Sequence, residues 1–223
     1  MFDWFLKSDP NLVLLSVLYI VAVVVVSEGL RKALSFPSDV SRKMVHVLVA
    51  VWALPTALLF ESPWWAALGP AIFVGVNALS YKYRWLDAME EDGKGSPGTI
   101  YFPLIFAVLI LVFWNLGSRA AMVAGIYAMG FGDAAASVIG RRWGKHTYHL
   151  LGVRKSYEGS LAMFVFAFAG ILLGTYPLQW TFQVVPALGA ALTSTLAEAP
   201  VGEGKDNLTV PAVAAIVFFF LQG

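Results

Sequence analysis

The residues with the clearest chemical potential lie between Met129 and Ser160, in the stretch MGFGDAAASVIGRRWGKHTYHLLGVRKSYEGS. Asp133, Ser137 and Arg141 are spaced at i, i+4 and i+8, so on a helix they form a polar stripe along one face. Asp133 lies eight residues before Arg141, about 12 Å further along such a helix. A carboxylate at that depth could hold a cation or accept a proton.

Small residues form a second stripe beside the polar one. Gly132, Ala136 and Gly140 follow each other at intervals of four residues. This small-xxx-small spacing is typical of helices that pack closely, and it predicts a neighbouring helix at this face.

The segment from Arg141 to Lys155 contains five basic residues and two histidines and reads as a loop. The next apolar run begins directly after it, with the polar or small residues Ser156, Glu158, Gly159 and Ser160. A helix N-terminus offers free N–H groups and partial positive charge, so together with Lys155 and Arg141 it would suit a polyphosphate. The pattern is not a P-loop, because Gly144-Lys145 is followed by His146.

Further oxygen ligands follow the seventh apolar run, which ends at Glu198, and precede the eighth, which begins after Asp206-Asn207. If Glu198 and Asp206 meet Asp133 and Glu158 at one face, they could hold Mg²⁺, with phosphate oxygens and water completing the octahedron. Asp206-Asn207 could also cap the last helix, and the two roles are compatible.

Near the start of the second apolar run, Arg42, Lys43 and His46 share one side of the expected helix. The two basic residues could serve only as membrane-interface anchors. A histidine inside a spanning helix costs free energy unless it is paired, so we expect Lys43 and His46 to contact the nucleotide or the lipid.

Composition identifies the setting of these residues. The 223 residues are 59% hydrophobic and 13% charged, which is typical of a polytopic membrane protein. We therefore predict an all-α fold with about eight transmembrane helices, or seven because some runs are short, in a single domain covering 1–223. The apolar runs are roughly 11–27, 44–60, 64–80, 100–116, 120–140, 160–175, 182–198 and 208–221.

The basic residues predict the orientation of the chain. With eight spans, one side carries 13 of the 15 basic residues, and Lys7 and Arg119 lie on the other. The 13 are Arg31, Lys32, Arg42, Lys43, Lys82, Arg84, Lys94, Arg141, Arg142, Lys145, Arg154, Lys155 and Lys205. The positive-inside rule then places the site at the cytoplasmic face and both termini outside.

The net charge is only +1 and the basic residues lie in short loops, so the sequence gives no sign of a nucleic-acid partner. The absence of cysteine excludes thiolate chemistry.

Four motifs occur in order: Arg42-Lys43-x-x-His46, then Gly132-Asp133 to Gly144, then Lys155-Ser156-Tyr-Glu158-Gly159-Ser160, then Glu198 with Asp206-Asn207-Leu-Thr-Val-Pro211. Together they resemble the CTP-dependent lipid kinase family, which includes dolichol kinase, phytol kinase and the yeast-type diacylglycerol kinase. The resemblance covers about residues 40–215. It implies transfer of the γ-phosphate of CTP to the hydroxyl of a membrane lipid with a divalent cation.

On this basis the catalytic candidates are Asp133, Lys155 and Glu158, with Asp133 as metal ligand or proton acceptor. The predicted nucleotide-binding residues are Lys43, His46, Arg141, Lys155, Ser156, Gly159, Ser160 and Asn207. The predicted Mg²⁺ ligands are Asp133, Glu158, Glu198 and Asp206. In-line phosphoryl transfer requires these functions of charge neutralisation and positioning.

Two alternatives remain open. Phosphatidate cytidylyltransferases are similar in the first part of the motif set, but this chain lacks their C-terminal Pro-Gly-His-Gly-Gly and Asp-Arg-x-Asp. A transporter would show inverted repeats or paired broken helices, which the sequence lacks.

Plant phytol kinases carry Asp where this chain has Ser137. This departure counts against phytol as the substrate and leaves diacylglycerol, polyprenol or another isoprenoid alcohol open. The short chain favours a prokaryotic inner membrane.

Overall fold

The computed structural model describes residues 8–83, 98–202 and 204–223, and within these ranges the helices form eight rods. The rods follow the eight predicted apolar runs in order. They are α2 (Asp9–Leu34), α3 (Ser38–Val51) with α4 (Ala53–Leu59), α5 (Pro63–Tyr83), α6 (Gly98–Asn115), the chain of α7 (Arg119–Tyr127), η2 (Ala128–Asp133) and α8 (Ala134–Trp143), α9 (Tyr157–Gln179), α10 (Val184–Glu198) and α11 (Asp206–Leu221). Two strands, β1 (Thr147–Leu150) and β2 (Val153–Ser156), lie between α8 and α9.

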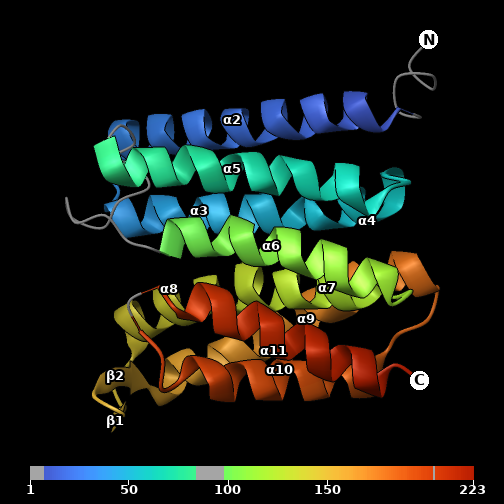
Figure 1. The fold of residues 1–223 in the computed structure, drawn as a ribbon. Coiled ribbons are helices and arrows are strands. Elements are labelled where there is room, and N and C mark those ends of the chain that lie inside the picture. The colour runs from blue at the N-terminus through green and yellow to red at the C-terminus, as the bar shows by residue number, and fades with distance from the viewer. Residues whose placement is uncertain (1–7, 84–97, 203) are drawn as a thin grey trace.

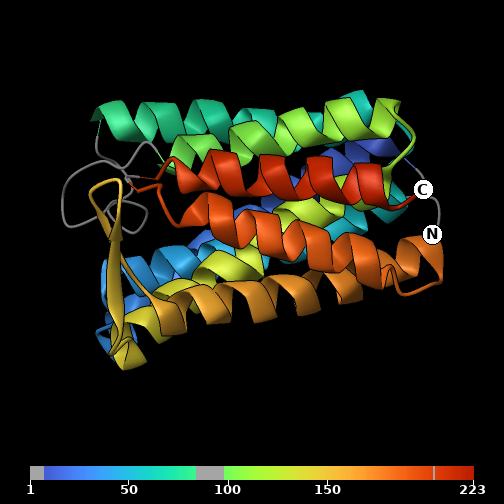
Figure 2. The ribbon, with the colours of Figure 1, turned by 90° about the horizontal axis from the view of Figure 1, so that it is seen from below.

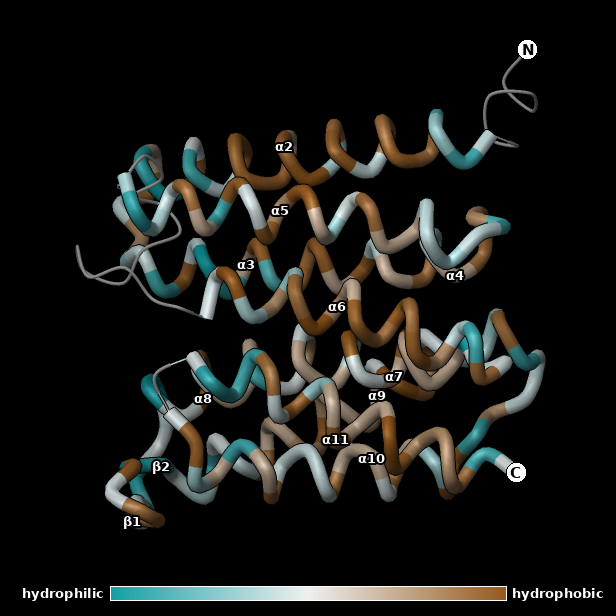
Figure 3. The backbone as a smooth tube through the Cα atoms, viewed as in Figure 1, coloured by the Kyte–Doolittle hydropathy of each residue, from teal (hydrophilic) through white to brown (hydrophobic). Residues whose placement is uncertain are grey.

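The predicted all-α polytopic membrane fold is confirmed. Five rods are long and apolar enough to cross a membrane, namely Asp9–Leu34, Ser38–Leu59, Gly98–Asn115, Arg119–Trp143 and Tyr157–Gln179. The helices α10 and α11 are shorter apolar helices that pack beside them. Hydrophobic residues fill the middle of the rods and hydrophilic residues gather toward their ends (Figure 3).

The rods run side by side, with the hairpin at one end of the bundle and the start of α2 and the end of α11 at the other (Figures 1 and 2). Most of the predicted cytoplasmic basic residues belong to elements that meet at the hairpin end, whereas Arg119 begins α7 at the opposite end. Lys7, Arg84 and Lys94 lie outside the described residues.

The rod of α7, η2 and α8 is the centre of the bundle. Residues 120–130 are all buried, and α7 packs against α6, α9 and α11. The η2 segment is a π-helix that ends at Asp133, and such segments recur at functional sites because they turn side chains away from the α-helical register. This rod therefore carries Asp133 into the interior of the bundle.

The second rod is broken near its centre, at Trp52 between α3 and α4. Pro55 has no N–H to donate to the Val51 carbonyl four residues earlier, so the regular helical bond is lost there. The Tyr127 hydroxyl donates to that carbonyl at 3.4 Å instead. The break thus joins the second rod to the central one.

The small residues of the central rod allow two helices to approach it closely, as the sequence predicted for Gly132 and Gly140. A Cβ atom on Gly132 would lie 2.8 Å from the Met163 sulfur on α9, and one on Gly140 would lie 3.2 Å from the Ser156 hydroxyl. On the other side, a Cβ on Gly130 would lie 2.2 Å from the Ala50 Cβ on α3. Asp133 is consequently held between α3 and α9.

We expect Gly130→Val to destabilise the fold by about 1–3 kcal/mol, because the added side chain overlaps α3. Thermal unfolding in detergent measures the effect. Gly75→Val is the matched control, since nothing lies within 4 Å of a Cβ at that helical position in α5. Equal melting temperatures for the two variants would contradict the close packing at Gly130.

The segment expected as a loop between α8 and α9 folds instead into a β-hairpin. Leu150 pairs with Val153, which leaves a two-residue turn of Leu151 and Gly152 with φ angles of 49° and 82°. Positive φ at both central positions is the geometry that matches the twist of antiparallel strands, and Gly152 adopts it without strain. The hairpin stands across the end of the bundle (Figure 2) and directs β2 into the start of α9.

Candidate active site

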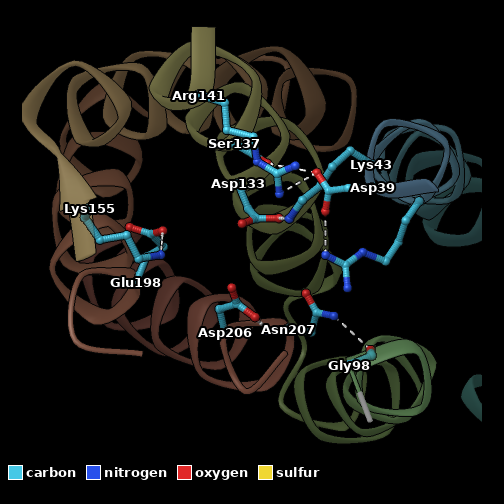
Figure 4. Close-up of polar contacts among 11 residues, drawn as sticks. Asp39, Lys43, Gly98, Asp133, Ser137, Arg141, Lys155, Glu198, Asp206 and Asn207 are labelled. Atoms are coloured by element: carbon cyan, nitrogen blue, oxygen red, sulfur yellow. Dashed lines mark hydrogen bonds and ion pairs between the residues drawn. The ribbon is translucent and has the colours of Figure 1, made fainter. Parts of the chain in front are cut away.

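A polar cavity of about 550 Å³ lies at the hairpin end of the bundle, lined by α3, η2, α8, the hairpin, α9, α10 and α11. Figure 4 looks into it, and the labelled side chains surround one central opening. Ten of the twelve predicted site residues line it: Lys43, Asp133, Arg141, Lys155, Ser156, Gly159, Ser160, Glu198, Asp206 and Asn207. The fold thus gathers residues from the four sequence motifs in one place.

Asp133 lies at the inner wall of the cavity and forms an ion pair with Lys43 of α3. The two residues are 3% and 8% exposed. A buried charge without compensation costs several kcal/mol, so the pair makes a carboxylate tolerable at this depth. Lys43 is therefore positioned by Asp133 and not free at the membrane interface.

A second ion pair crosses the opposite wall. Lys155 extends from β2 to the carboxylate of Glu198 at the end of α10 (Figure 4). Glu198 is 4% exposed, and both side chains line the cavity. The pair links the hairpin to the bundle and presents a cation to the cavity.

Asp39 is a cavity residue that the sequence analysis missed. It is buried in the first turn of α3, and its carboxylate forms ion pairs of 2.7 Å with Arg42 and with Arg141. The Ser137 hydroxyl donates to the same carboxylate at 3.3 Å. The predicted stripe of Asp133, Ser137 and Arg141 therefore faces α3 along its whole length. Asp39 precedes Lys43 by four residues, which places both on one face of the helix, and this spacing could have revealed it.

We expect Asp39→Asn to raise the KM for the nucleotide about tenfold, because a charge-assisted hydrogen bond is worth roughly 1.5–3 kcal/mol and this carboxylate positions two arginines. Steady-state kinetics with varied nucleotide measures it. Glu28→Gln is the matched control, since Glu28 likewise pairs with two basic residues, Arg31 and Lys32, but does not line the cavity. An unchanged KM in Asp39→Asn would show that Arg141 does not need this partner.

The start of α11 contributes Asp206 and Asn207. The side-chain amide of Asn207 donates to the Gly98 carbonyl at 2.8 Å and so ties α11 to the first residue of α6. The position before the helix is occupied by Lys205, which makes no side-chain cap, so neither predicted residue is the N-cap. The Asp206 carboxylate accepts from the Asn207 backbone N–H at 3.0 Å and points into the opening (Figure 4).

The N-terminus of α9 also faces the cavity. Ser156 is its N-cap, and the hydroxyl accepts from the Gly159 N–H at 3.1 Å. A Cβ on Gly159 would lie 3.1 Å from the Ala136 carbonyl of α8, so any larger residue would require its neighbours to shift. Ser160 lines the cavity beside it and shares a 2.7 Å hydrogen bond with Tyr148.

Two predicted residues lie elsewhere. Glu158 sits at the base of the hairpin, where its carboxylate accepts from the His146 backbone N–H at 3.2 Å and contacts the His146 ring at 2.7 Å. It does not line the polar cavity. His46 does not line it either, but faces a separate apolar cavity between α2, α3, α5 and α6. The predicted catalytic and metal roles of Glu158 have no support in this geometry.

The charges that line the cavity nearly balance. The cations are Arg42, Lys43, Arg141, Arg154 and Lys155, and the carboxylates are Asp39, Asp133, Glu198 and Asp206. In the described ranges no three His, Cys, Asp or Glu side chains come close enough to form a preformed metal site. Mg²⁺ commonly binds proteins through one or two carboxylates, with substrate phosphates and water completing its shell. Asp206 points into the opening and, among the described residues, forms no ion pair with a lysine, unlike Asp133 and Glu198. It therefore fits such a ligand.

The chain is similar over most of its length to proteins named as kinases of isoprenoid alcohols. It is 33% identical to a phytol kinase of Synechocystis sp., over 91% of this chain and 88% of that protein. It is 26% identical to a probable chloroplastic phytol kinase of Oryza sativa, over 88% and 68% of the two chains. A dolichol kinase of Schizosaccharomyces pombe is 25% identical over 79% of this chain and 38% of its own. No family model and no solved structure matches the chain.

Proposed function

Because the chain belongs to the family of lipid kinases that includes the phytol kinases and dolichol kinases, we propose that it transfers the γ-phosphate of CTP to the hydroxyl of an isoprenoid alcohol. The observation that carries this proposal is the polar cavity itself. It combines several cationic side chains and a helix N-terminus, which suit a triphosphate, with the buried carboxylate of Asp133 at its inner wall.

The proposed acceptor is a phytol-like alcohol. The names of the relatives favour isoprenoid alcohols over diacylglycerol. The sequence departure at Ser137 carries little weight against phytol, because Ser137 lines the polar cavity and hydrogen-bonds Asp39. It does not line the apolar cavity between α2, α3, α5 and α6.

The cavity residues have different roles in the proposed reaction. Lys155 and Arg141 hold the phosphate oxygens, as a compact and a forked donor respectively, and Arg154, exposed at the cavity wall, adds a third cation. The alcohol oxygen forms a bond to the γ-phosphorus while the bond from that phosphorus to the bridging oxygen breaks, and CDP leaves. Asp133, held by Lys43, accepts the proton of the attacking hydroxyl or ligates the metal; both roles use the same inward carboxylate.

The residues that would hold Mg²⁺ are Asp206 with Glu198 or Asp133, since these carboxylates border one opening (Figure 4). A bound Mg²⁺ supplies neutralisation of the charge on the triphosphate. The near balance of charge in the cavity supports this role, because a triphosphate bound alone would leave the site strongly negative.

The chain is an integral membrane protein, and we place the cavity at the cytoplasmic face with both termini on the far side. The concentration of basic residues at the hairpin end supports this orientation. A prokaryotic inner membrane, or one derived from it, is consistent with relatives from a cyanobacterium and from chloroplasts.

The test is an incubation of the purified full chain with Mg²⁺, phytol and CTP labelled at the γ-phosphate, beside a parallel reaction labelled at the α-phosphate. We expect label from the γ position, and not from the α position, in the lipid fraction. Excess unlabelled CTP should suppress the signal more strongly than ATP, and EDTA should abolish it.

Other outcomes would replace the proposal. Lipid labelled from the α position identifies a cytidylyltransferase. Label from neither position, with ATP also inactive and with dolichol and diacylglycerol supplied in place of phytol, rejects the kinase reaction for this chain.

A further inference from the structure

A second cavity of about 290 Å³ lies between α2, α3, α5 and α6. Its lining is almost entirely apolar, with valine, isoleucine, phenylalanine and proline side chains. Val21 and Val25 of α2 border it and are 47% and 64% exposed, so the cavity opens at the lateral surface of the bundle. In a membrane this surface faces hydrocarbon. We call this cavity the chain pocket.

The chain pocket has a polar feature at its α3 wall. His46 is 4% exposed, its ring packs on Phe102 at 4.6 Å, and its Nδ1 atom has no hydrogen-bond partner among the described residues. Asn77 also borders the pocket. Its side-chain amide donates to the Thr99 carbonyl, and its side-chain carbonyl oxygen has no hydrogen-bond partner among the described residues. Hydrocarbon cannot satisfy such groups, so a ligand that carries a hydroxyl would lower their free energy cost.

The chain pocket and the polar cavity meet at α3. Lys43 lines the polar cavity and pairs with Asp133, while His46, one helical turn later, lines the chain pocket. Residues three apart on a helix have Cβ atoms about 5–6 Å apart, so the two cavities present polar groups within the reach of one small headgroup. The backbone of His46 also contacts the central rod, since a Cβ on Gly130 would lie 3.3 Å from its carbonyl oxygen.

We propose that the chain pocket binds the hydrocarbon chain of the alcohol substrate and that His46 hydrogen-bonds its hydroxyl, which then lies near Asp133. This inference rests on the proposed kinase function and deepens it. The pocket volume is at the lower end of the range for small-molecule sites and suits one chain better than two. The substrate class is therefore a single-chain alcohol, with diacylglycerol disfavoured. His46 is accordingly assigned to the lipid and not to the nucleotide.

Photolabelling tests the location without requiring turnover. The full chain in nanodiscs is irradiated with a phytol analogue that carries a diazirine close to its hydroxyl, in the absence of nucleotide, and the labelled peptides are mapped by mass spectrometry. We expect label on the lining residues of α3 and α6 next to His46, such as Val45 and Phe102, reduced by excess phytol but not by diacylglycerol. Label confined to other helices, or label that phytol does not displace, would overturn the inference.

Two matched substitutions on α2 test whether filling the pocket matters. Val24 lines the pocket, whereas Val26 is 55% exposed and does not. We expect Val24→Trp to reduce the photolabelling and to raise the KM for the alcohol about tenfold, a change of roughly 1.4 kcal/mol, with the KM for CTP unchanged. Val26→Trp should match the unmodified chain in each measurement. Equal behaviour of the two variants would reject the pocket as the binding site.

His46→Phe tests the hydrogen bond while preserving the ring contact with Phe102. We expect kcat/KM for the alcohol to fall about tenfold, a factor typical of one lost hydrogen bond, and the KM for CTP to stay constant, with partial recovery in His46→Gln. A higher KM for CTP instead would assign His46 to the nucleotide.

The experiments distinguish failure of this inference from failure of the proposed kinase function. Labelling of the pocket without phosphorylation of the alcohol rejects the kinase function alone. Phosphorylation of the alcohol with labelling at other helices rejects the inference alone.

Discussion

Asp133→Asn should lower kcat by about 10²–10⁴-fold, the range observed when a positioned proton acceptor is removed. The substitution preserves the shape of the side chain at the inner wall of the cavity but removes the charge that faces Lys43. Measurement of kcat with saturating CTP and alcohol tests it. Asp9→Asn is the matched control, because Asp9 accepts backbone hydrogen bonds at the start of α2, at the opposite end of the bundle, and should leave kcat unchanged.

A folding defect could imitate this result, because Lys43 would remain buried without its partner. Breaking a buried ion pair on one side costs about 3–5 kcal/mol. The double variant Lys43→Met with Asp133→Leu removes both charges, so it should melt close to the unmodified chain and still be inactive. A folded Asp133→Asn protein with full activity would reject the assignment.

Two readouts separate the possible roles of Asp133 in the residual activity of Asp133→Asn. If the carboxylate ligates Mg²⁺, the concentration of Mg²⁺ required for half-maximal activity should rise. If it accepts the hydroxyl proton, the Mg²⁺ requirement should stay constant and the acidic limb of the pH–rate profile should be lost. Each result selects one role for the same inward carboxylate.

Lys155→Met should lower kcat/KM for CTP by about 10²–10³-fold, the effect of removing one donor that stabilises developing charge in a water-poor site. The cation lies between the hairpin and α10, paired with Glu198 and in contact with the cavity. Lys145→Met is the matched control, because Lys145 is exposed and does not line the cavity. Lys155→Arg should recover only part of the activity, since a planar fork does not replace a compact ammonium group.

The buried partner Glu198 requires a second comparison. In Lys155→Met its carboxylate loses the ammonium group, so Glu198→Gln is added to relieve the unpaired charge. The double variant should recover thermal stability without recovering kcat/KM. If activity returns together with stability, Lys155 serves only to compensate Glu198 and has no contact with the phosphates.

The sequence alone was sufficient to predict the features that a hydrocarbon environment imposes on each segment separately. Backbone groups in a bilayer must be satisfied within their own segment, so long apolar runs become helices wherever they occur. For this reason the eight runs and the fold class could be predicted. The small stripe containing Gly132 was also readable, because four-residue spacing defines a helical face without knowledge of the partner.

Most of the candidate site was identified for a related reason. A charged residue inside a spanning helix is costly unless it is paired, so Asp133 stood out. Lys155, Glu198 and Asp206 stood out because they border apolar runs on the same side of the membrane. Asp39 did not, because its position beside Arg42 resembled an ordinary helix start.

Only the tertiary structure decided how these groups pair. Lys43 meets Asp133 across 90 positions of sequence, and Lys155 meets Glu198 across 43, contacts that no local spacing encodes. Glu158 and Ser160 are two residues apart at the start of one helix, yet Glu158 turns to His146 at the hairpin base while Ser160 faces the cavity. Successive residues of a helix point in different directions, so which of them reaches a shared site depends on where the neighbouring rods lie. The same reason divides α3, whose sequence places Lys43 and His46 on one side and whose packing assigns them to different cavities.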